Sequence, residues 1–288
     1  MADLAPALYV VSTPIGNLGD VTYRAVEVLR AADVILAEDT RRTGTLLRHY
    51  HIQGRLVSAH EHNERRRAET VVEMLREGRS VALVSDAGTP LLSDPGARIA
   101  RAVLEAGYDV VPIPGASALL AALVSSGLPA ERFTFYGFIP RKGGPRRELL
   151  GEIAGSAYAA VVYESPHRLT ELLADLAGFA GADRRVAVAR ELTKLHEEVV
   201  RGTLGELRER FDGVKVKGEI AVVLEGRPES EEADMAPAED EQVRALALGF
   251  LARGMSPSRA ARELQQLTGV PRNAAYELMV ELAREGQG

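Results

Sequence analysis

The chain has 288 residues, a formal net charge of −6 and 46% hydrophobic residues, which is ordinary for two globular domains with a small appendage. It has no cysteine, which excludes a disulfide framework, a thiolate metal site and a cysteine nucleophile. No apolar run approaches the roughly 18 residues of a membrane span, and the first one, Leu8 to Val11, is a strand candidate rather than a signal segment. We therefore expect a cytoplasmic protein without a membrane anchor.

The first part of the chain alternates short apolar runs with helical patterns, which predicts a parallel sheet built from strand–helix–strand units. Asp20 is expected to cap the first helix, and Asn63 a charged helix that runs to about Glu77. The strand candidates lie at 8–12, 34–37, 56–58, 81–84 and 110–113. Ligands of such sheets bind at the loops that leave the carboxyl ends of the strands.

The stretch from Val81 to Gly96 is the strongest candidate for a ligand loop. Its buried strand leads into a turn of small and polar residues, Ser85 to Pro90. Asp94 followed by Pro95 is the pattern of a helix N-cap and first helical position. Capping therefore accounts for Asp94, and Asp86 is the aspartate expected to meet a ligand.

The second part of the chain combines strand–helix–strand units with consecutive strands, which predicts a mixed sheet covered by helices. Its strand candidates lie at 134–140, 160–163, 186–189, 199–203 and 220–224. The segment RKGGPRR, Arg141 to Arg147, is expected to be an exposed basic loop.

The composition changes between Pro228 and Glu241, where seven acidic residues occur without one basic residue. Such a segment is typical of a solvated linker. Three short helical patterns follow and predict a helix-turn-helix-like appendage, whose lack of a dense basic face favours packing or dimerisation over nucleic-acid binding. We therefore predict two α/β domains, residues 1–117 and 118–227. An acidic linker, residues 228–241, joins them to a helical appendage, residues 242–288.

Two motifs suggest other chemistry. Gly16 and Gly19 follow a strand, and Glu38 or Asp39 lies about 20 residues on, as in a dinucleotide site, but the spacing is G-x-x-G rather than G-x-G-x-x-G. His60-Glu61-His62 suggests a metal site but lacks the H-E-x-x-H spacing, so a polar loop is favoured and no metal is expected.

Basic residues follow several strand ends and would meet at one rim of a parallel sheet. They are Arg41, Arg42, Arg141, Lys142, Arg146, Arg147, His167 and Arg168. A cluster of this kind is either a solvated surface or a set of contacts to the phosphates of a nucleic acid. Both interpretations stay open on the residues alone, and the sequence has neither a nucleophile elbow nor a P-loop.

Eight blocks in order give the chain a specific resemblance. They are LYVVSTPIGNLGD (8–20), ILAEDTRRT (35–43), VSDAGTPLLSDPG (84–96), PGASA (114–118), FYGFIPRK (135–142), YESPHR (163–168), ARELTKLHEE (189–198) and KGEIAVVLEG (217–226). The chain resembles the 16S ribosomal RNA (cytidine-2′-O)-methyltransferases of the tetrapyrrole (corrin/porphyrin) methylase superfamily. The resemblance covers about residues 8 to 226, and the helical tail is also expected in that family.

The resemblance implies two α/β domains of the class III methyltransferase type, usually in a homodimer, with S-adenosylmethionine held in the cleft between them. The residues it implies at the cofactor are Pro14, Asp86, Ala87, Gly88, Thr89, Pro90, Ala116, Ser117, Tyr163, Leu192 and Ala221. Many members of the superfamily carry Gly-Asp-Pro in the loop where this chain has Gly88-Thr89-Pro90. No role of that aspartate is transferred to Thr89.

The implied reaction is 2′-O-methylation of a cytidine in small-subunit ribosomal RNA, with the basic residues above other than Lys142 as RNA contacts. A positioned base would help a ribose hydroxyl by about 10²–10⁴-fold. The candidates are His60, Glu191, Asp39 and Lys142, with Asp39 and Lys142 ranked first as catalytic residues. The alternatives are a small-molecule methylase acting on a tetrapyrrole, and a noncatalytic RNA-binding or ribosome-assembly protein.

Overall fold

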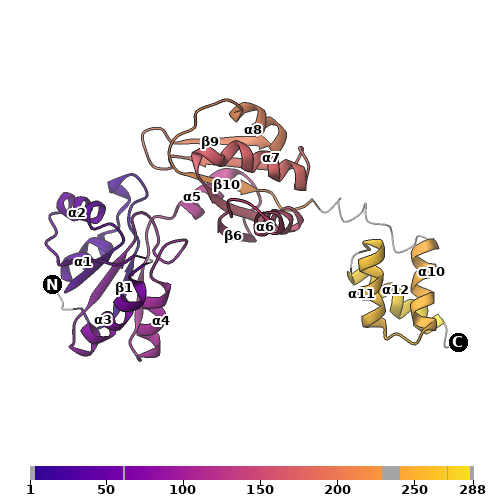
Figure 1. The fold of residues 1–288 in the computed structure, drawn as a ribbon, viewed down its shortest axis with the longest axis horizontal. Helices are drawn as coiled ribbons and strands as arrows, with labels where there is room; N and C mark the ends of the chain where they lie inside the picture. Colours follow the sequence, from indigo (N-terminus) through magenta and orange to yellow (C-terminus); the bar gives the residue numbers. More distant parts are fainter. Residues whose placement is uncertain (1–3, 61, 229–240, 271, 286–288) are drawn as a thin grey trace. The chain divides into compact units, whose positions relative to one another are not determined.

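The computed structural model describes residues 4–60, 62–228, 241–270 and 272–285, and divides the chain into two compact units, 1–225 and 226–288 (Figure 1). Most of the predicted acidic linker and Glu61 of the histidine motif lie outside the described residues. In the described part of the chain, no helix is long and apolar enough to cross a membrane.

The first sheet has the strand order β3-β2-β4-β1-β5, and every pairing in it is parallel, as the alternating pattern predicts. Its strands are β1 (Leu8–Val11), β2 (Val34–Ala37), β3 (Leu56–Ser58), β4 (Val81–Val84) and β5 (Val110–Ile113). Alternate strand residues pack on opposite faces. One face is covered by α1 (Tyr23–Ala31) and α2 (Thr40–His49), and the other by α3 (Glu64–Arg76) and α4 (Ala97–Glu105).

The second sheet is mixed, as expected, with the order β6-β7-β10-β8-β9. Its strands are β6 (Phe133–Phe138), β7 (Ala159–Glu164), β8 (Arg185–Arg190), β9 (Glu198–Thr203) and β10 (Ile220–Leu224). One face packs against α6 (Gly144–Gly155), α7 (Leu169–Ala180) and α8 (Leu204–Phe211). The other packs against α5 (Ala118–Ser126), the helix that follows β5.

The second unit is a bundle of three helices around its own apolar core. They are α10 (Glu241–Ala252), α11 (Pro257–Thr268) and α12 (Arg272–Glu285). Ala247, Leu264 and Met279 contribute one buried side chain from each helix.

Two capping predictions, at Asp20 and Asp94, were wrong because other residues take the expected role, and Asn63 stands at the predicted N-cap position without a side-chain capping bond. Asp20 ends the short 3-10 helix η1 (Leu18–Asp20), and the N-cap of α1 is Thr22, whose hydroxyl accepts from the Ala25 N–H at 3.1 Å. Asn63 stands at the N-cap position of α3, but its side chain binds the His60 N–H instead. The correction at Asp94 concerns the site.

Candidate active site

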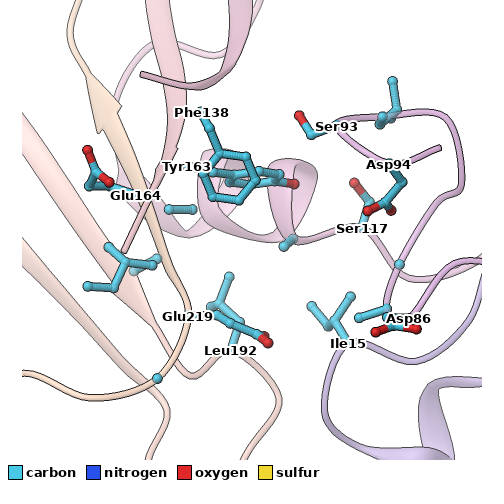
Figure 2. A pocket seen from close by; sticks show the side chains of 18 of the residues that line it. Ile15, Asp86, Ser93, Asp94, Ser117, Phe138, Tyr163, Glu164, Leu192 and Glu219 are labelled. Carbon is cyan, nitrogen blue, oxygen red and sulfur yellow. The ribbon is translucent and has the colours of Figure 1, made fainter. Parts of the chain in front are cut away.

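A cavity of about 390 Å³ lies where the loops at the carboxyl ends of β1 and β4 face the second sheet (Figure 2). This volume is in the range of small-molecule and cofactor sites. The first half of the chain lines it with Ile15, Arg42, Asp86, Ala87, Gly88, Thr89, Leu92, Ser93, Asp94, Ser117 and Ala118. The second half lines it with Phe138, Tyr163, Glu164, Ser165, Pro166, Ala189, Leu192, Gly218, Glu219, Ile220 and Ala221.

Hydrogen bonds join the loops after β1, β4 and β5 into one wall of the cavity. The N–H of Thr13 donates to the carbonyl of Gly88 at 2.9 Å, and the N–H of Gly88 donates back to Thr13 at 3.0 Å. The Ser12 hydroxyl donates to the Thr89 hydroxyl at 3.2 Å, which donates to the Ala116 carbonyl at 3.3 Å. These contacts tie the ligand loop to the loops after β1 and β5.

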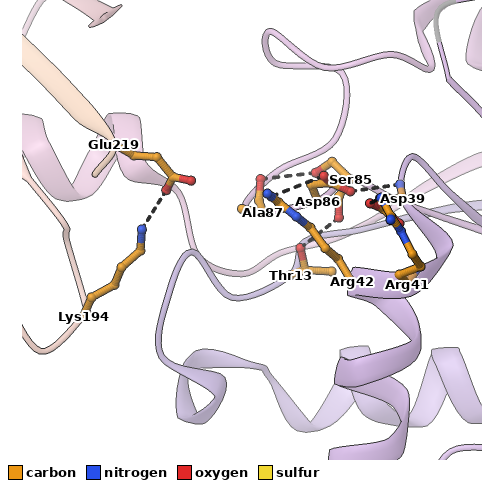
Figure 3. A network of polar contacts seen from close by, with 9 residues as sticks. All are labelled: Thr13, Asp39, Arg41, Arg42, Ser85, Asp86, Ala87, Lys194 and Glu219. Atoms are coloured by element: carbon orange, nitrogen blue, oxygen red, sulfur yellow. Dashed lines mark hydrogen bonds and ion pairs between the residues drawn. The ribbon is translucent and has the colours of Figure 1, made fainter. Parts of the chain in front are cut away.

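Asp86 is bound on both of its carboxylate oxygens (Figure 3). Its Oδ1 accepts from the backbone N–H of Asp39 at 2.9 Å, and its Oδ2 lies 3.3 Å from the Arg42 guanidinium. The carboxylate therefore links the loop after β4 to the start of α2.

Asp94 does not cap α4, which contradicts the expectation from the Asp-Pro pattern. The helix begins at Ala97, and its N-cap position is Gly96. The acceptor is Glu64 of α3, which is 8% exposed and whose Oε1 accepts from the N–H of Gly96 at 3.0 Å and of Arg98 at 2.7 Å. Burial raises the pKa of Asp94, and the neighbouring Asp86 raises it further, while a hydrogen bond from Ser85 opposes them.

Aromatic and small apolar side chains form the opposite wall. The Tyr163 ring packs edge-on against Phe135, with ring centroids 4.9 Å apart, and lies 5.6 Å from the Phe138 ring. Burial raises the pKa of the Tyr163 phenol. Leu192 (Figure 2) also lines the cavity, as does Ala221, which is paired with Tyr163 in the sheet. The cavity thus has a polar, partly anionic wall and a largely apolar wall, to which Glu164, Ser165 and Glu219 add polar groups.

The sequence model of the tetrapyrrole (corrin/porphyrin) methylase family matches residues 7–208, which include both sheets apart from β10. The chain belongs to this family. A second model, the RsmI C-terminal HTH domain, matches residues 235–283, the region of α10 to α12.

Relatives of this methylase extend over nearly the whole chain. The ribosomal RNA small subunit methyltransferase I of Synechocystis sp. is 45% identical over 97% of this chain and 99% of that protein. The protein of the same name from Escherichia coli O157:H7 is 45% identical over 95% of this chain and 94% of that protein. The fold also matches a crystal structure of uroporphyrin-III C-methyltransferase from Thermus thermophilus complexed with S-adenyl homocysteine, with a TM-score of 0.55 and 21% identity over 76% of this chain and 97% of that one.

The structure brings together most of the cofactor residues that the resemblance implies for this methylase. Those lining the cavity are Asp86, Ala87, Gly88, Thr89, Ser117, Tyr163, Leu192 and Ala221. Pro14, Pro90 and Ala116 are chain neighbours of lining residues but are not part of the lining. Sequence reasoning missed Ile15, Leu92, Phe138 and Glu219. Leu92 and Phe138 are apolar residues that stay exposed at a loop and at a strand end, which is a property of the fold rather than a signal in the sequence.

The two base candidates ranked first from sequence lie outside the cavity lining. Asp39 is the N-cap of α2: its Oδ1 accepts from the Arg41 N–H at 2.8 Å, and its Oδ2 forms an ion pair with the Arg41 guanidinium at 2.8 Å. Hydrogen bonds from the Arg41 side chain and backbone lower the pKa of Asp39 to about 2, which suits a cap better than a base. Lys142 is exposed ahead of α6.

The other two base candidates also have local roles. Glu191 binds the Lys194 ammonium at 2.8 Å, which lowers its pKa, and Lys194 also binds Glu219 at 3.1 Å (Figure 3). His60 lies 3.2 Å from the amide nitrogen of Asn63. Neither residue is part of the cavity lining.

The basic residues divide into exposed and structural ones. Arg41, Arg42, Arg141, Lys142, Arg147 and His167 are exposed. Arg146 contradicts the expected exposed loop, because it lies in the first turn of α6, is 5% exposed, and binds Asp175 at 2.7 Å and the Pro140 carbonyl at 3.1 Å. Arg168 is mostly covered and donates to the Pro140 carbonyl at 3.2 Å. Arg146 therefore supports the fold.

Proposed function

We propose that this chain transfers the methyl group of S-adenosylmethionine to the ribose 2′-hydroxyl of a cytidine in 16S ribosomal RNA. The observation that carries the proposal is the match, over nearly the full length of both chains, to proteins named ribosomal RNA small subunit methyltransferase I. The acceptor atom and the nucleotide come from the family resemblance of the sequence motifs.

The residues of the cavity fit a cofactor with one cationic centre and one flat apolar group. Asp86, Asp94 and Glu219 provide negative charge that favours a sulfonium and an ammonium, and Leu192, Ala189 and Ala221 provide apolar surface for an adenine. The cofactor supplies a methyl group already activated by its sulfonium. The task of the protein is then to align the ribose hydroxyl with the methyl–sulfur bond and to exclude water. In this proposal, residues 1–117 and 118–227 form the two domains that enclose the cofactor.

Exposed cations, one of which (Arg42) lines the cavity, are proposed to hold the RNA backbone. They are Arg41, Arg42, Arg141, Lys142, Arg147 and His167. Each phosphate contact releases counterions, so binding weakens steeply with salt. Arg147→Ala should reduce the slope of log affinity against log salt by roughly 1, whereas Arg101→Ala, on the outer side of α4, should leave it unchanged. Equal slopes for Arg147→Ala and wild type would remove Arg147 from the proposed RNA contact.

We also propose that the enzyme is a cytoplasmic homodimer and that it acts on the small subunit or its precursors. Leu120 and Val124, one turn apart on α5, are 50% and 76% exposed and would suit a contact with a second copy. Light scattering on the purified chain tests the dimer, and Val124→Glu should shift the mass towards the monomer if α5 contributes.

The decisive experiment is incubation of small subunits from a strain lacking this methylation with the chain and isotope-labelled S-adenosylmethionine. Mass spectrometry of nuclease digests should find labelled 2′-O-methylcytidine. Label in a tetrapyrrole instead of RNA would favour the small-molecule methylase, and no transfer with intact RNA binding would favour the noncatalytic assembly protein.

A further inference from the structure

Phe138, at the carboxyl end of β6, is the most exposed large apolar residue in the lining of the cavity. It is 61% exposed, whereas Ile15 and Ile220 of the same lining are buried. Covering an exposed aromatic ring with another flat apolar surface is favourable, because water is released from both. Phe138 is therefore a candidate contact for a substrate with a flat ring.

A bulge in β6 sets the direction of the Phe138 side chain. The register against β7 shifts between Phe135 and Gly137, so that Phe138 pairs with Tyr163. Because successive side chains of a strand point to opposite faces, a regular strand would place Phe138 on the face opposite to Phe135. With the bulge, both phenylalanine rings contact the Tyr163 ring, at centroid distances of 4.9 Å and 5.6 Å. The bulge thus aims Phe138 into the cavity (Figure 2).

The backbone on both sides of Phe138 is held in place. Gly137 has a φ of 65°, and an added Cβ there would lie 2.8 Å from the Ser93 hydroxyl, so the loop after β4 packs closely against the bulge. On the other side, the Arg168 guanidinium donates to the Pro140 carbonyl at 3.2 Å, and Arg146 donates to the same carbonyl at 3.1 Å. The exposed ring is therefore presented by a fixed end of the strand.

Cations accompany the exposed ring. Arg141 and Lys142 are exposed and follow Phe138 closely in the sequence, and Arg42 lines the same cavity. Unpaired RNA is recognised by this combination, in which bases stack on aromatic side chains while lysine and arginine hold the phosphates. The end of β6 therefore carries both kinds of contact that an RNA strand needs.

We propose that the base of the acceptor nucleotide leaves the RNA stack and stacks on the Phe138 ring. The inference rests on the proposed function and deepens it, because it assigns a residue to the recognition of the cytosine. The proposed adenine surface consists of residues that are more covered than Phe138, namely Ala189, Leu192 and Ala221. A base that belongs to a large RNA has to reach the cavity from its exposed side. Holding the base also fixes the ribose attached to it, which is the group that has to be aligned with the cofactor.

The test measures kcat/KM for small subunits that lack the methylation, at saturating S-adenosylmethionine. Phe138→Ala removes the stacking surface and should lower kcat/KM by roughly 5- to 150-fold. Phe138→Tyr and Phe138→Trp keep an aromatic face and should stay within about 3-fold of wild type, whereas Phe138→Leu keeps only apolar volume and should lose at least about 5-fold. The calorimetric affinity for S-adenosylmethionine should not change in any variant. Phe133→Ala, at the exposed start of the same strand and outside the cavity lining, is the matched control and should keep the wild-type kcat/KM.

Three outcomes would overturn the stacking role of Phe138. They are a wild-type kcat/KM in Phe138→Ala, equal activity of Phe138→Leu and Phe138→Tyr, and a loss that calorimetry traces to weaker binding of S-adenosylmethionine, which would make Phe138 a cofactor contact. Urea unfolding checks that each variant is folded, and the comparison of Phe138→Leu with Phe138→Tyr decides the matter if Phe138→Ala does not fold. Wild type that makes no 2′-O-methylcytidine would instead reject the proposed function itself.

Discussion

The segments that follow β2 and β4 leave the same edge of one parallel sheet, and each places an aspartate near the start of a helix. After β2, Asp39 caps its own helix and pairs with Arg41. After β4, Asp94 leaves the helix start to Glu64 and lies at the cavity. Two similar sequence patterns therefore have different roles: Asp39 stabilises a helix start, and Asp94 lines the cavity.

The difference depends on whether a second acceptor reaches the helix start. α3 packs against α4, and this packing brings the buried Glu64 carboxylate to the N–H groups of Gly96 and Arg98. At the start of α2 the distant carboxylate of Asp86 accepts from the N-cap N–H of Asp39 alone, and the next capped N–H, that of Arg41, donates to Asp39 itself. The role of an aspartate at a helix start is thus set by tertiary neighbours as well as by its own position.

Removal of Glu64 should have the largest effect on this arrangement. Glu64→Ala leaves two N–H groups at the start of α4 without their charged acceptor, which should lower the free energy of unfolding by about 2–4 kcal/mol. Methyl transfer should also slow, because Asp94 becomes free to turn back and cap the helix. Urea unfolding measures the first effect and single-turnover assays the second. Glu69→Ala, on the exposed face of α3, is the control, and equal stability of the two variants would refute the role of Glu64.

Substitution of Gly96 is a second way to disturb the conformation of the loop after β4. Its φ is 126°, and an added Cβ would lie 2.7 Å from Cδ2 of the buried Leu83. Gly96→Ala should therefore cost about 1–3 kcal/mol in unfolding free energy. Gly155→Ala is the matched control, because this glycine ends α6 with open space around it, and the change should be neutral or stabilising by up to about 1 kcal/mol. A neutral Gly96→Ala would show that the loop relaxes freely.

The arrangement of strands could be predicted from sequence because apolar runs report burial directly. Strands buried on both faces read as continuous apolar segments, which is how 34–37 and 81–84 were found. Consecutive strands near the end of the second part predicted its mixed sheet. The rule that ligands meet strand ends also found Asp86 to Thr89 in the cavity lining.

The roles of individual polar residues could not be predicted in the same way, because their partners are distant in sequence. Glu64 and Gly96 are 32 positions apart, and Arg146 and Asp175 are 29 apart. No local pattern marks either pair. The segment 141–147, which has the composition of an exposed basic loop, therefore contains the buried Arg146. Asp94, which has the sequence pattern of a helix cap, lines the cavity instead.

The smallest change in the free energy of unfolding is expected from substitution of Asp39. The pH dependence of that change tests whether Asp39 is a helix cap. Hydrogen bonds from Arg41 lower the pKa of Asp39 from 3.8 to about 2 in the folded protein, so its ionised form stabilises the fold at every pH above the unfolded value. Asp39→Asn should destabilise the chain slightly at pH 7, since Arg41 is 89% exposed and salt screens the pair. The difference from wild type should stay constant above about pH 5 and disappear as pH falls from about 4 towards 2. Urea unfolding of both proteins across this range measures it. A difference that grows in acid would mean that Asp39 is protonated more readily in the folded state, which would reopen the case for Asp39 as a base.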